Sequence, residues 1–153
     1  MVKTPELSVV VPVYGQFNLA RANISVQSIL SQQDIAYEVI VSEQGEAPRF
    51  PKIKGIKHLF EYHKPKPDLS DFNPGKIRNK AISQATGEFL YTNDADIVFL
   101  QKDYLARCVE EMKKFPSRVF YRPFMRRLPM DEFSQFEKLV QKTVLQKQYN
   151  QLI

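Results

Sequence analysis

The sequence has little cysteine and no long apolar run, and both shortages exclude whole classes of protein. Cys108 is the single cysteine among 153 residues, so no internal disulfide can form. Its apolar, helical surroundings predict a buried thiol without a catalytic role. A membrane-spanning helix needs a run of about 18 apolar residues, and the chain contains none. The apolar stretch from Leu7 to Tyr14 is too short and too far inside for a secretory h-region, so we expect a cytoplasmic protein.

Several ligand-binding motifs are absent as well. No GxGxxG follows the first apolar stretch, so a dinucleotide-binding fold is unsupported. A P-loop would need Ser or Thr directly after Lys76, where Ile77 stands. The two histidines, His58 and His63, have no cysteine or carboxylate at metal-ligand spacing, so we predict surface or strand-edge positions for them.

Positive charge is concentrated in the last third of the chain. Residues 1–100 contain 11 basic and 11 acidic side chains, whereas residues 101–153 contain 11 basic and 6 acidic ones. This asymmetry predicts an anionic partner for that end: a nucleic acid, a phosphorylated substrate or an acidic membrane surface. The alternative is a solvated basic face. We expect the basic segment 118–153, with Arg122, Arg126 and Arg127, to contact an anionic acceptor, a partner chain or the inner face of a membrane.

Strand and helix patterns alternate along the chain. The stretches from Leu7 to Tyr14 and from Tyr37 to Gly45 are apolar on both faces, which is typical of buried parallel strands. Apolar residues from Leu19 to Leu30 lie at helical spacing between them. The sequence therefore begins with a strand, a helix and a second strand that form a βαβ unit.

The same pattern continues beyond a loop rich in proline and lysine. Asn73 and Pro74 predict the cap and first position of a helix that Gly87 closes. Further expected elements are strands at 57–63 and 88–93, a helix at 103–115, an extended segment at 118–128 and a last helix from about residue 131. We predict one α/β domain over 1–153, a mostly parallel sheet between helix layers, with core motifs at 8–116 and a basic extension at 117–153.

Two aspartates follow the predicted strand at 88–93. Asp94 and Asp96 are separated by one alanine at what should be the carboxyl end of a parallel strand, where α/β proteins place functional groups. Oxygen ligands on a short turn suit Mg²⁺ or Mn²⁺ when water and substrate phosphates complete the coordination. The alternative is a turn in which the aspartates bind only their own backbone.

The predicted helix after Asn73 carries positive charge at its start. Lys76, Arg78 and Lys80 lie in its first two turns, at the positive end of the helix dipole, where cations are disfavoured by about 0.3 to 1 kcal/mol each. Something anionic would offset that cost, and a helix N-terminus with added Lys and Arg is suited to a diphosphate. The alternative is a set of exposed basic residues that contact nothing.

Five short segments together resemble a known family. They are "SVVVPVYGQ" (8–16), "VSEQG" (41–45), "GKIRNKAI" (75–82), "ATGE" (85–88) and "DAD" (94–96). Their order and spacing resemble the family 2 type glycosyltransferases with the GT-A fold, a Rossmann-like α/β/α sandwich. The segments "FNPGKIRN" and "DADI" also resemble the galactosyl- and N-acetylgalactosaminyltransferase branch.

The resemblance implies a nucleotide-sugar donor, with a UDP-sugar the expected one, and a glycan or lipid-linked acceptor. It implies that the nucleoside stacks on a wall formed by Pro12, Val13 and Tyr14. It also implies that Glu43 contacts the uracil edge, although the family usually has two aspartates where this chain has Ser42 and Glu43.

The remaining implied roles concern the diphosphate, the sugar and the metal. Lys76, Arg78 and Asn79 would lie over the nucleotide, with Arg78 the best candidate for a diphosphate contact. Asp94 would face the ribose or donor sugar, and Asp96 would bind Mn²⁺ or Mg²⁺, with Asp94 as a second candidate ligand.

Family members normally continue into an acceptor half that supplies the catalytic base. We assign no catalytic base here and expect this chain to supply the donor-binding half, completed by further sequence or by another chain. Three functions are therefore open: a metal-dependent glycosyltransferase, a non-catalytic module that binds a nucleotide sugar or polyanion, and a nucleic-acid-binding domain. The third lacks a recognised module, and the acidic pair would repel phosphate backbones without a metal, so we expect no nucleic-acid partner.

Overall fold

A computed structural model describes residues 4–15, 19–64, 66, 72–114 and 138 of the chain. Contacts divide the chain into a unit of residues 1–119 and a unit of residues 120–153, and every element below belongs to the first unit. In chain order the elements are β1 (Leu7–Tyr14), α1 (Leu19–Leu30), β2 (Tyr37–Gly45), β3 (Ile56–Tyr62), α2 (Pro74–Ile82), β4 (Phe89–Thr92) and α3 (Tyr104–Lys114). The extended segment predicted at 118–128, with Arg122, Arg126 and Arg127, lies outside the described residues, as does almost all of the predicted last helix.

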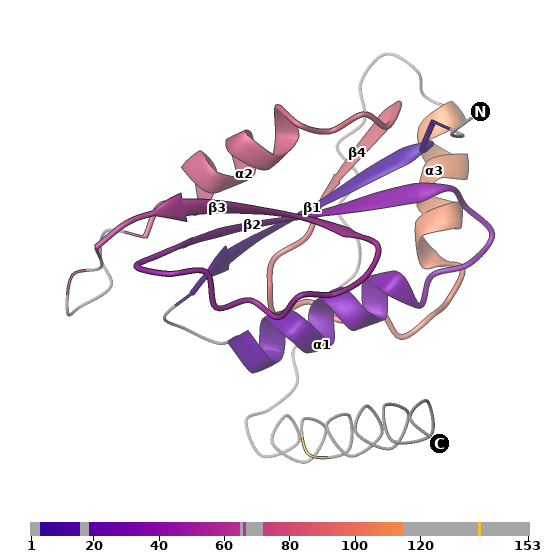
Figure 1. The fold of residues 1–153 in the computed structure, drawn as a ribbon. Helices are drawn as coiled ribbons and strands as arrows, with labels where there is room; N and C mark the ends of the chain where they lie inside the picture. The colour runs from indigo at the N-terminus through magenta and orange to yellow at the C-terminus, as the bar shows by residue number, and fades with distance from the viewer. Residues whose placement is uncertain (1–3, 16–18, 65, 67–71, 115–137, 139–153) are drawn as a thin grey trace. The chain divides into compact units, whose positions relative to one another are not determined.

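The strands form a parallel four-stranded sheet in the order β3-β2-β1-β4 (Figure 1). All eight residues of β1 are buried, because β2 and β4 pair with its two edges and helices cover both of its faces. A strand without a solvent face must be apolar throughout, which is the pattern seen in the sequence. The predicted α/β class with a parallel sheet is confirmed.

The helices lie on opposite faces of the sheet. Val9, Val11 and Val13 of β1 pack in one apolar cluster with residues of α1 and α3, whereas Val10 packs in a second cluster with Ala81 of α2. Alternate side chains of a strand point to opposite faces, so odd-numbered residues of β1 face α1 and α3, and even-numbered ones face α2. Figure 1 shows α2 on one side of the sheet and α1 on the other.

Helix α2 begins where the sequence predicts and ends earlier. The Asn73 side chain accepts a hydrogen bond from the backbone N–H of Lys76 at 2.9 Å, and Pro74 occupies the first turn. The helix stops at Ile82, and the predicted extension to Gly87 is wrong. Residues 83–88 instead form the turn that leads into β4.

A carboxylate holds this turn against the sheet. Glu38 of β2 accepts hydrogen bonds from Ser8 Oγ at 2.6 Å and from the backbone N and Oγ1 of Thr86 at 2.6 and 2.8 Å. Burial opposes the charged form of Glu38, but these hydrogen bonds outweigh it and lower the pKa of this carboxyl. A Cβ atom on Gly87 would lie 2.6 Å from the backbone nitrogen of Ser8. Gly87 is therefore required by close approach to β1.

Two further expectations can be compared with the structure. Cys108 is buried on α3, as predicted, and burial raises the pKa of its thiol. Within the described ranges, none of the helices has the length and apolar character needed to cross a membrane.

We predict that Gly87→Ala destabilises the fold by about 1 to 3 kcal/mol, because the added methyl group meets the backbone of β1. Urea unfolding followed by circular dichroism measures this change. Gly75→Ala is the matched control, since its Cβ meets only Asn73 Oδ1, at 3.4 Å. Equal stability of Gly87→Ala and the parent would show that the turn at 83–88 can move away from β1.

Candidate functional site

The candidate site lies at the carboxyl ends of the parallel strands. The order β2-β1-β4 places β1 between the other two, so their carboxyl ends lie at one edge of the sheet, where Tyr14 pairs with Gln44 and Thr92 ends level with Val10. Ligands of open α/β sheets bind at this edge. The predicted site residues of β1, β2 and the turn after β4 therefore share one end of the fold.

The turn after β4 is anchored by a buried asparagine. Asn93 is fully buried, and its side-chain amide donates to Ser25 Oγ at 3.0 Å and to the carbonyl oxygens of Asp94 and Ile97 at 3.0 and 3.3 Å. Ser25 in turn donates to the Ile97 carbonyl at 2.6 Å. These bonds hold the backbone on which both aspartates lie. Asn93 was not assigned from the sequence, although a polar residue at the end of a strand was a signal for it.

The structure brings two predicted site residues into contact. Arg78 Nη2 of α2 donates to Asp94 Oδ1 at 2.7 Å. The Arg78 side chain is 29% exposed and that of Asp94 is 61% exposed, so both ends of the pair remain accessible from solvent. Arg78 of the helix and Asp94 after the strand thus form an ion pair that links α2 to the aspartate turn.

Asp96 differs from Asp94 in its surroundings. It is exposed, and no described residue forms a hydrogen bond or ion pair with it. No group of three His, Cys, Asp or Glu side chains in the described ranges could hold a metal ion. A pair of carboxylates on one turn fits Mg²⁺ or Mn²⁺ only when water and phosphate oxygens supply the other ligands, which is the chemistry predicted from the sequence.

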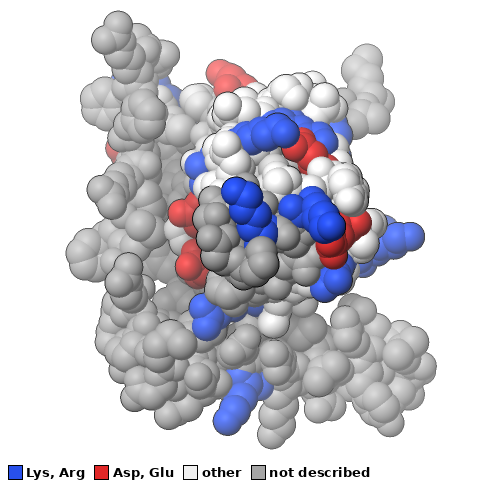
Figure 2. Space-filling view, turned by 90° about the vertical axis from the view of Figure 1, so that its left-hand side faces the viewer, with Lys and Arg blue, Asp and Glu red and all other residues white. Residues whose placement is uncertain are grey.

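The other cations of α2 have partners inside the protein. Glu61 at the end of β3 pairs with Lys76 at 2.6 Å and with Lys80 at 3.4 Å. The hydrogen bond from Lys76 lowers the pKa of Glu61. Asn79 is exposed on the same helix. The positive helix start is therefore offset by the protein's own carboxylates, and Figure 2 shows acidic side chains directly beside basic ones on this face of the molecule.

Glu43 is turned into the protein. It is fully buried, and Oε1 accepts from the backbone N–H groups of Arg49 and Phe50 at 2.8 and 3.1 Å. Its Oε2 lies 2.8 Å from His58 Nε2. A Cβ on Gly15 would lie 2.5 Å from Oε1, so any other residue there would displace the Glu43 carboxylate. Glu43 fastens residues 49 and 50 to the end of β2, and its contact to uracil stays a prediction that this geometry does not favour.

The two histidines lie where the sequence places them, but one contact was missed. His58 is on the edge strand β3 with its side chain 23% exposed, and His63 follows that strand. The hydrogen bond from His58 to Glu43 joins residues 15 positions apart. No short-range spacing could have indicated it.

The predicted nucleoside wall is divided between the two faces of the sheet. Val13 packs in the core on the side of α1 and α3, whereas Pro12 and Tyr14 face α2. The Tyr14 ring stacks on Phe72, with ring centroids 4.8 Å apart and planes 24° apart. Phe72 directly precedes the cap of α2 and was not assigned from the sequence.

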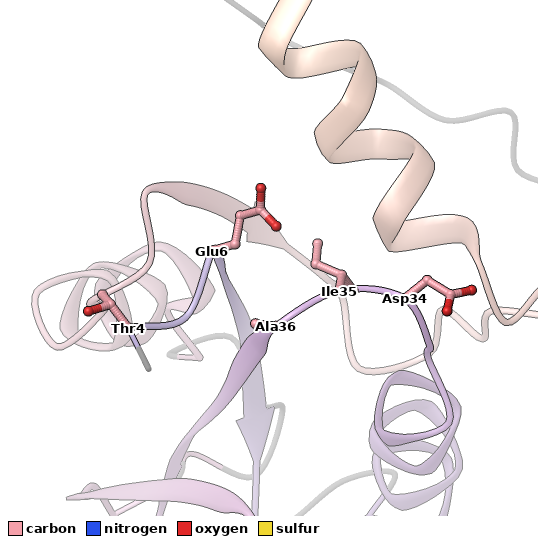
Figure 3. A pocket seen from close by; sticks show the side chains of 5 residues that line it. All are labelled: Thr4, Glu6, Asp34, Ile35 and Ala36. Carbon is pink, nitrogen blue, oxygen red and sulfur yellow. The ribbon is translucent and has the colours of Figure 1, made fainter. Parts of the chain in front are cut away.

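One pocket lies at the opposite end of the sheet. Its volume is about 600 Å³, and it is lined by residues that precede β1 and β2: Thr4, Glu6, Asp34, Ile35 and Ala36. Figure 3 shows the acidic side chains of Glu6 and Asp34 separated by Ile35. Glu6 also pairs with Lys113 of α3. None of the predicted site residues lines this pocket.

The parallel sheet with helices on both faces defines an α/β protein of GT-A type. Over residues 8–151 the chain matches the profile of glycosyl transferase family 2, and it belongs to that family. This confirms the family resemblance seen in the sequence. The resemblance to the galactosyltransferase branch stays a prediction.

Solved structures of a staphylococcal protein share the fold. S. aureus TarS matches with a TM-score of 0.53 and 21% identity over 82% of this chain and 23% of that chain. A form of TarS with residues 1–349, solved in complex with UDP, matches with a TM-score of 0.52 and 20% identity over 82% of this chain and 38% of that one. This chain therefore spans well under half of these structures. No curated protein sequence matches it significantly.

We predict that Asn93→Ala destabilises the protein by about 1 to 3 kcal/mol, because the change removes a buried amide that donates to three acceptors. Denaturant unfolding measures this change. Thr92→Ala, one residue earlier and exposed, is the matched control and should shift stability by less than about 1 kcal/mol. A similar small effect of both variants would mean that the aspartate turn is held without Asn93.

Proposed function

We propose that the chain is the donor-binding half of a metal-dependent glycosyltransferase. The enzyme would transfer a sugar from a nucleotide-sugar donor, with a UDP-sugar the expected one, to a glycan or lipid-linked acceptor. The observation that carries this proposal is the contact between Arg78 and Asp94, which joins the cationic start of α2 to the aspartate turn at one strand end. Membership of the family and the UDP complex of TarS support it.

Each site residue has a task in this proposal. Asp96, exposed and without a described partner, would hold Mn²⁺ or Mg²⁺. Arg78 and Lys76 would bind oxygens of the diphosphate, and Asn79 lies on the same helix turn. When bound, the metal would supply positive charge that stabilises the departing diphosphate. Asp94 would face the ribose or donor sugar.

The pair between Arg78 and Asp94 couples these tasks. Arg78 cannot give its full charge to a diphosphate while Asp94 holds it at 2.7 Å. A cation near Asp94 would compete for the same carboxylate and release Arg78. Nucleotide and metal should therefore bind more tightly together than apart.

The acceptor side of the reaction involves the rest of the protein. We propose that segment 118–153, with Arg122, Arg126 and Arg127, contacts an anionic acceptor, a partner chain or a membrane surface. No catalytic base is assigned. A module that binds a nucleotide sugar without transfer is the alternative, and release of nucleotide diphosphate that depends on an added acceptor distinguishes the two.

We predict that Asp96→Asn lowers the affinity for UDP in the presence of Mn²⁺ by about tenfold or more, because the variant keeps the size of the side chain and loses the ligand charge. Calorimetric titration of UDP with and without Mn²⁺ measures this change. Stability should change little, since Asp96 is exposed. If the variant binds UDP as the parent does, the aspartates form only a turn.

Unlike Asp96→Asn, which should lower the affinity for UDP, Asp94→Asn should raise that affinity when metal is absent. The change removes the charge that holds Arg78, so the affinity for UDP without metal should rise, by up to about fivefold for an exposed ion pair. The gain from adding Mn²⁺ should shrink at the same time. Glu111→Gln, which breaks an exposed pair on α3, is the matched control. If Asp94→Asn instead binds UDP more weakly than the parent without metal, Arg78 does not leave Asp94 to bind the diphosphate.

A further inference from the structure

Strand β3 is an edge strand of the sheet. It pairs with β2 along one side, and no described strand pairs with its other side (Figure 1). The backbone N–H of His63, directly after β3, donates to the Gly45 carbonyl of β2 at 2.8 Å. Because backbone groups alternate along a strand, the odd-numbered residues of β3 bond to β2, and the even-numbered residues direct their N–H and C=O groups outward. Such an edge can accept one more strand.

Apolar side chains of β3 remain partly open to solvent on both faces of the sheet. Tyr62, at the end of the strand, is 69% exposed. Ile56 packs at the margin of the cluster with α1 and α3, Leu59 packs at the margin of the cluster with α2, and both are half-buried. A second strand along this edge would remove apolar surface of both faces from water, which favours association.

Lys57 and Glu61 lie on the same face of β3. Lys57 Nζ donates to the side chain of Gln84, just after α2, at 3.1 Å, and Glu61 pairs with Lys76 of α2 at 2.6 Å. Both therefore face α2, with opposite charges two residues to either side of Leu59. When two copies of β3 run antiparallel with Leu59 at the centre, Lys57 of each copy lies opposite Glu61 of the other. Opposite charges in directly opposed positions stabilise a strand pair.

The outward backbone groups fit the same register. In an antiparallel pair, opposed residues that exchange hydrogen bonds both direct their N–H and C=O groups toward the partner strand. With Leu59 at the centre, the opposed outward residues are His58 with Phe60 and Ile56 with Tyr62. A shift of one strand by two residues keeps outward residues opposed but separates Lys57 from Glu61. Backbone and charge complementarity therefore agree on one register.

We propose that β3 is the contact surface between two copies of this chain, which pair antiparallel about a twofold axis at Leu59 and join their sheets into one. A twofold axis makes such a contact self-complementary. Lys54 and Lys64 of the two copies face each other just beyond the paired segment, so pairing is limited to residues 56–62. The interface is small, so the dimer is weak. The proposal does not depend on the proposed sugar transfer.

Lys80 of α2 covers part of this edge in the single chain. Its Nζ atom donates to the outward carbonyl of Phe60 at 3.0 Å and lies 3.4 Å from Glu61 Oε2. The second copy supplies a replacement for each contact: the backbone N–H of its His58 for the Phe60 carbonyl, and its Lys57 for Glu61. The Lys80 side chain is 38% exposed, and exposed ion pairs contribute little, so this exchange costs little.

Charge reversal at Lys57 tests the contact. Lys57→Glu places like charges opposite each other at two symmetry-related positions, so the dissociation constant of the dimer should rise by about tenfold or more. Sedimentation velocity of the full chain over a range of concentrations measures it. Lys52→Glu is the matched control, because Lys52 is exposed and precedes the paired segment, and it should change the constant little.

A mixture of two variants tests the register itself. Glu61→Lys should also associate weakly with itself, because it opposes two lysines at each position. Equal amounts of Lys57→Glu and Glu61→Lys should form a heterodimer about as tight as the parent dimer, since both opposed pairs again carry opposite charges. Circular dichroism verifies that each variant is folded. No association in a mixture of folded variants overturns the register.

Lys80→Met gives an independent measurement, which also serves if Glu61→Lys does not fold. The change removes the donor that covers the Phe60 carbonyl at similar side-chain length, so the dissociation constant should fall by about threefold or more. An unchanged constant would overturn the exchange of Lys80 for groups of the second copy. A parent chain that stays monomeric at millimolar concentration overturns the whole proposal, as it must if another segment or another protein covers β3.

Discussion

The burial of β1 on both faces is the constraint on which the rest of the structure depends. Eight consecutive buried residues can be accommodated only if strands pair with both edges and helices cover both sides. This brings the end of β2 beside Tyr14 and the turn after β4 beside Val10, on opposite edges of the same strand. The candidate site is thus a consequence of how the central strand is buried.

The acidic residues of this domain divide into structural and exposed groups. Glu38, Glu43 and Glu61 all accept hydrogen bonds within the protein and fasten, respectively, the turn before β4, residues 49 and 50, and the start of α2. Asp94 is exposed and pairs with the half-buried Arg78, and Asp96 has no described partner. Only a carboxylate with unused lone pairs can bind a cation. The hydrogen-bond partners therefore distinguish Asp94 and Asp96, the candidate metal ligands, from glutamates that carry the same charge.

The cationic helix start illustrates why charge alone is an incomplete signal. The sequence predicts an anion that offsets Lys76, Arg78 and Lys80, and Glu61 and Asp94 supply that negative charge within the protein. These pairs are at least partly exposed, and such pairs contribute at most about 1 kcal/mol. The proposed diphosphate and metal would therefore replace them at small cost. The helix start is offset within the protein and remains partly exposed to solvent.

The sequence by itself determined the strands, the helix cap at Asn73, the family and the pairing of a cationic helix with an aspartate turn, because these depend on local periodicity and short motifs. Only the tertiary structure decided that α2 ends at Ile82, that Asn93 anchors the turn, and that Glu43 faces away from Gln44. Strand alternation shows that neighbouring side chains point to opposite faces of the sheet, but which helix covers each face is decided by how α1, α2 and α3 pack. The partners of Glu43 come from residues 6 to 15 positions along the chain, and only folding brings them within hydrogen-bond distance.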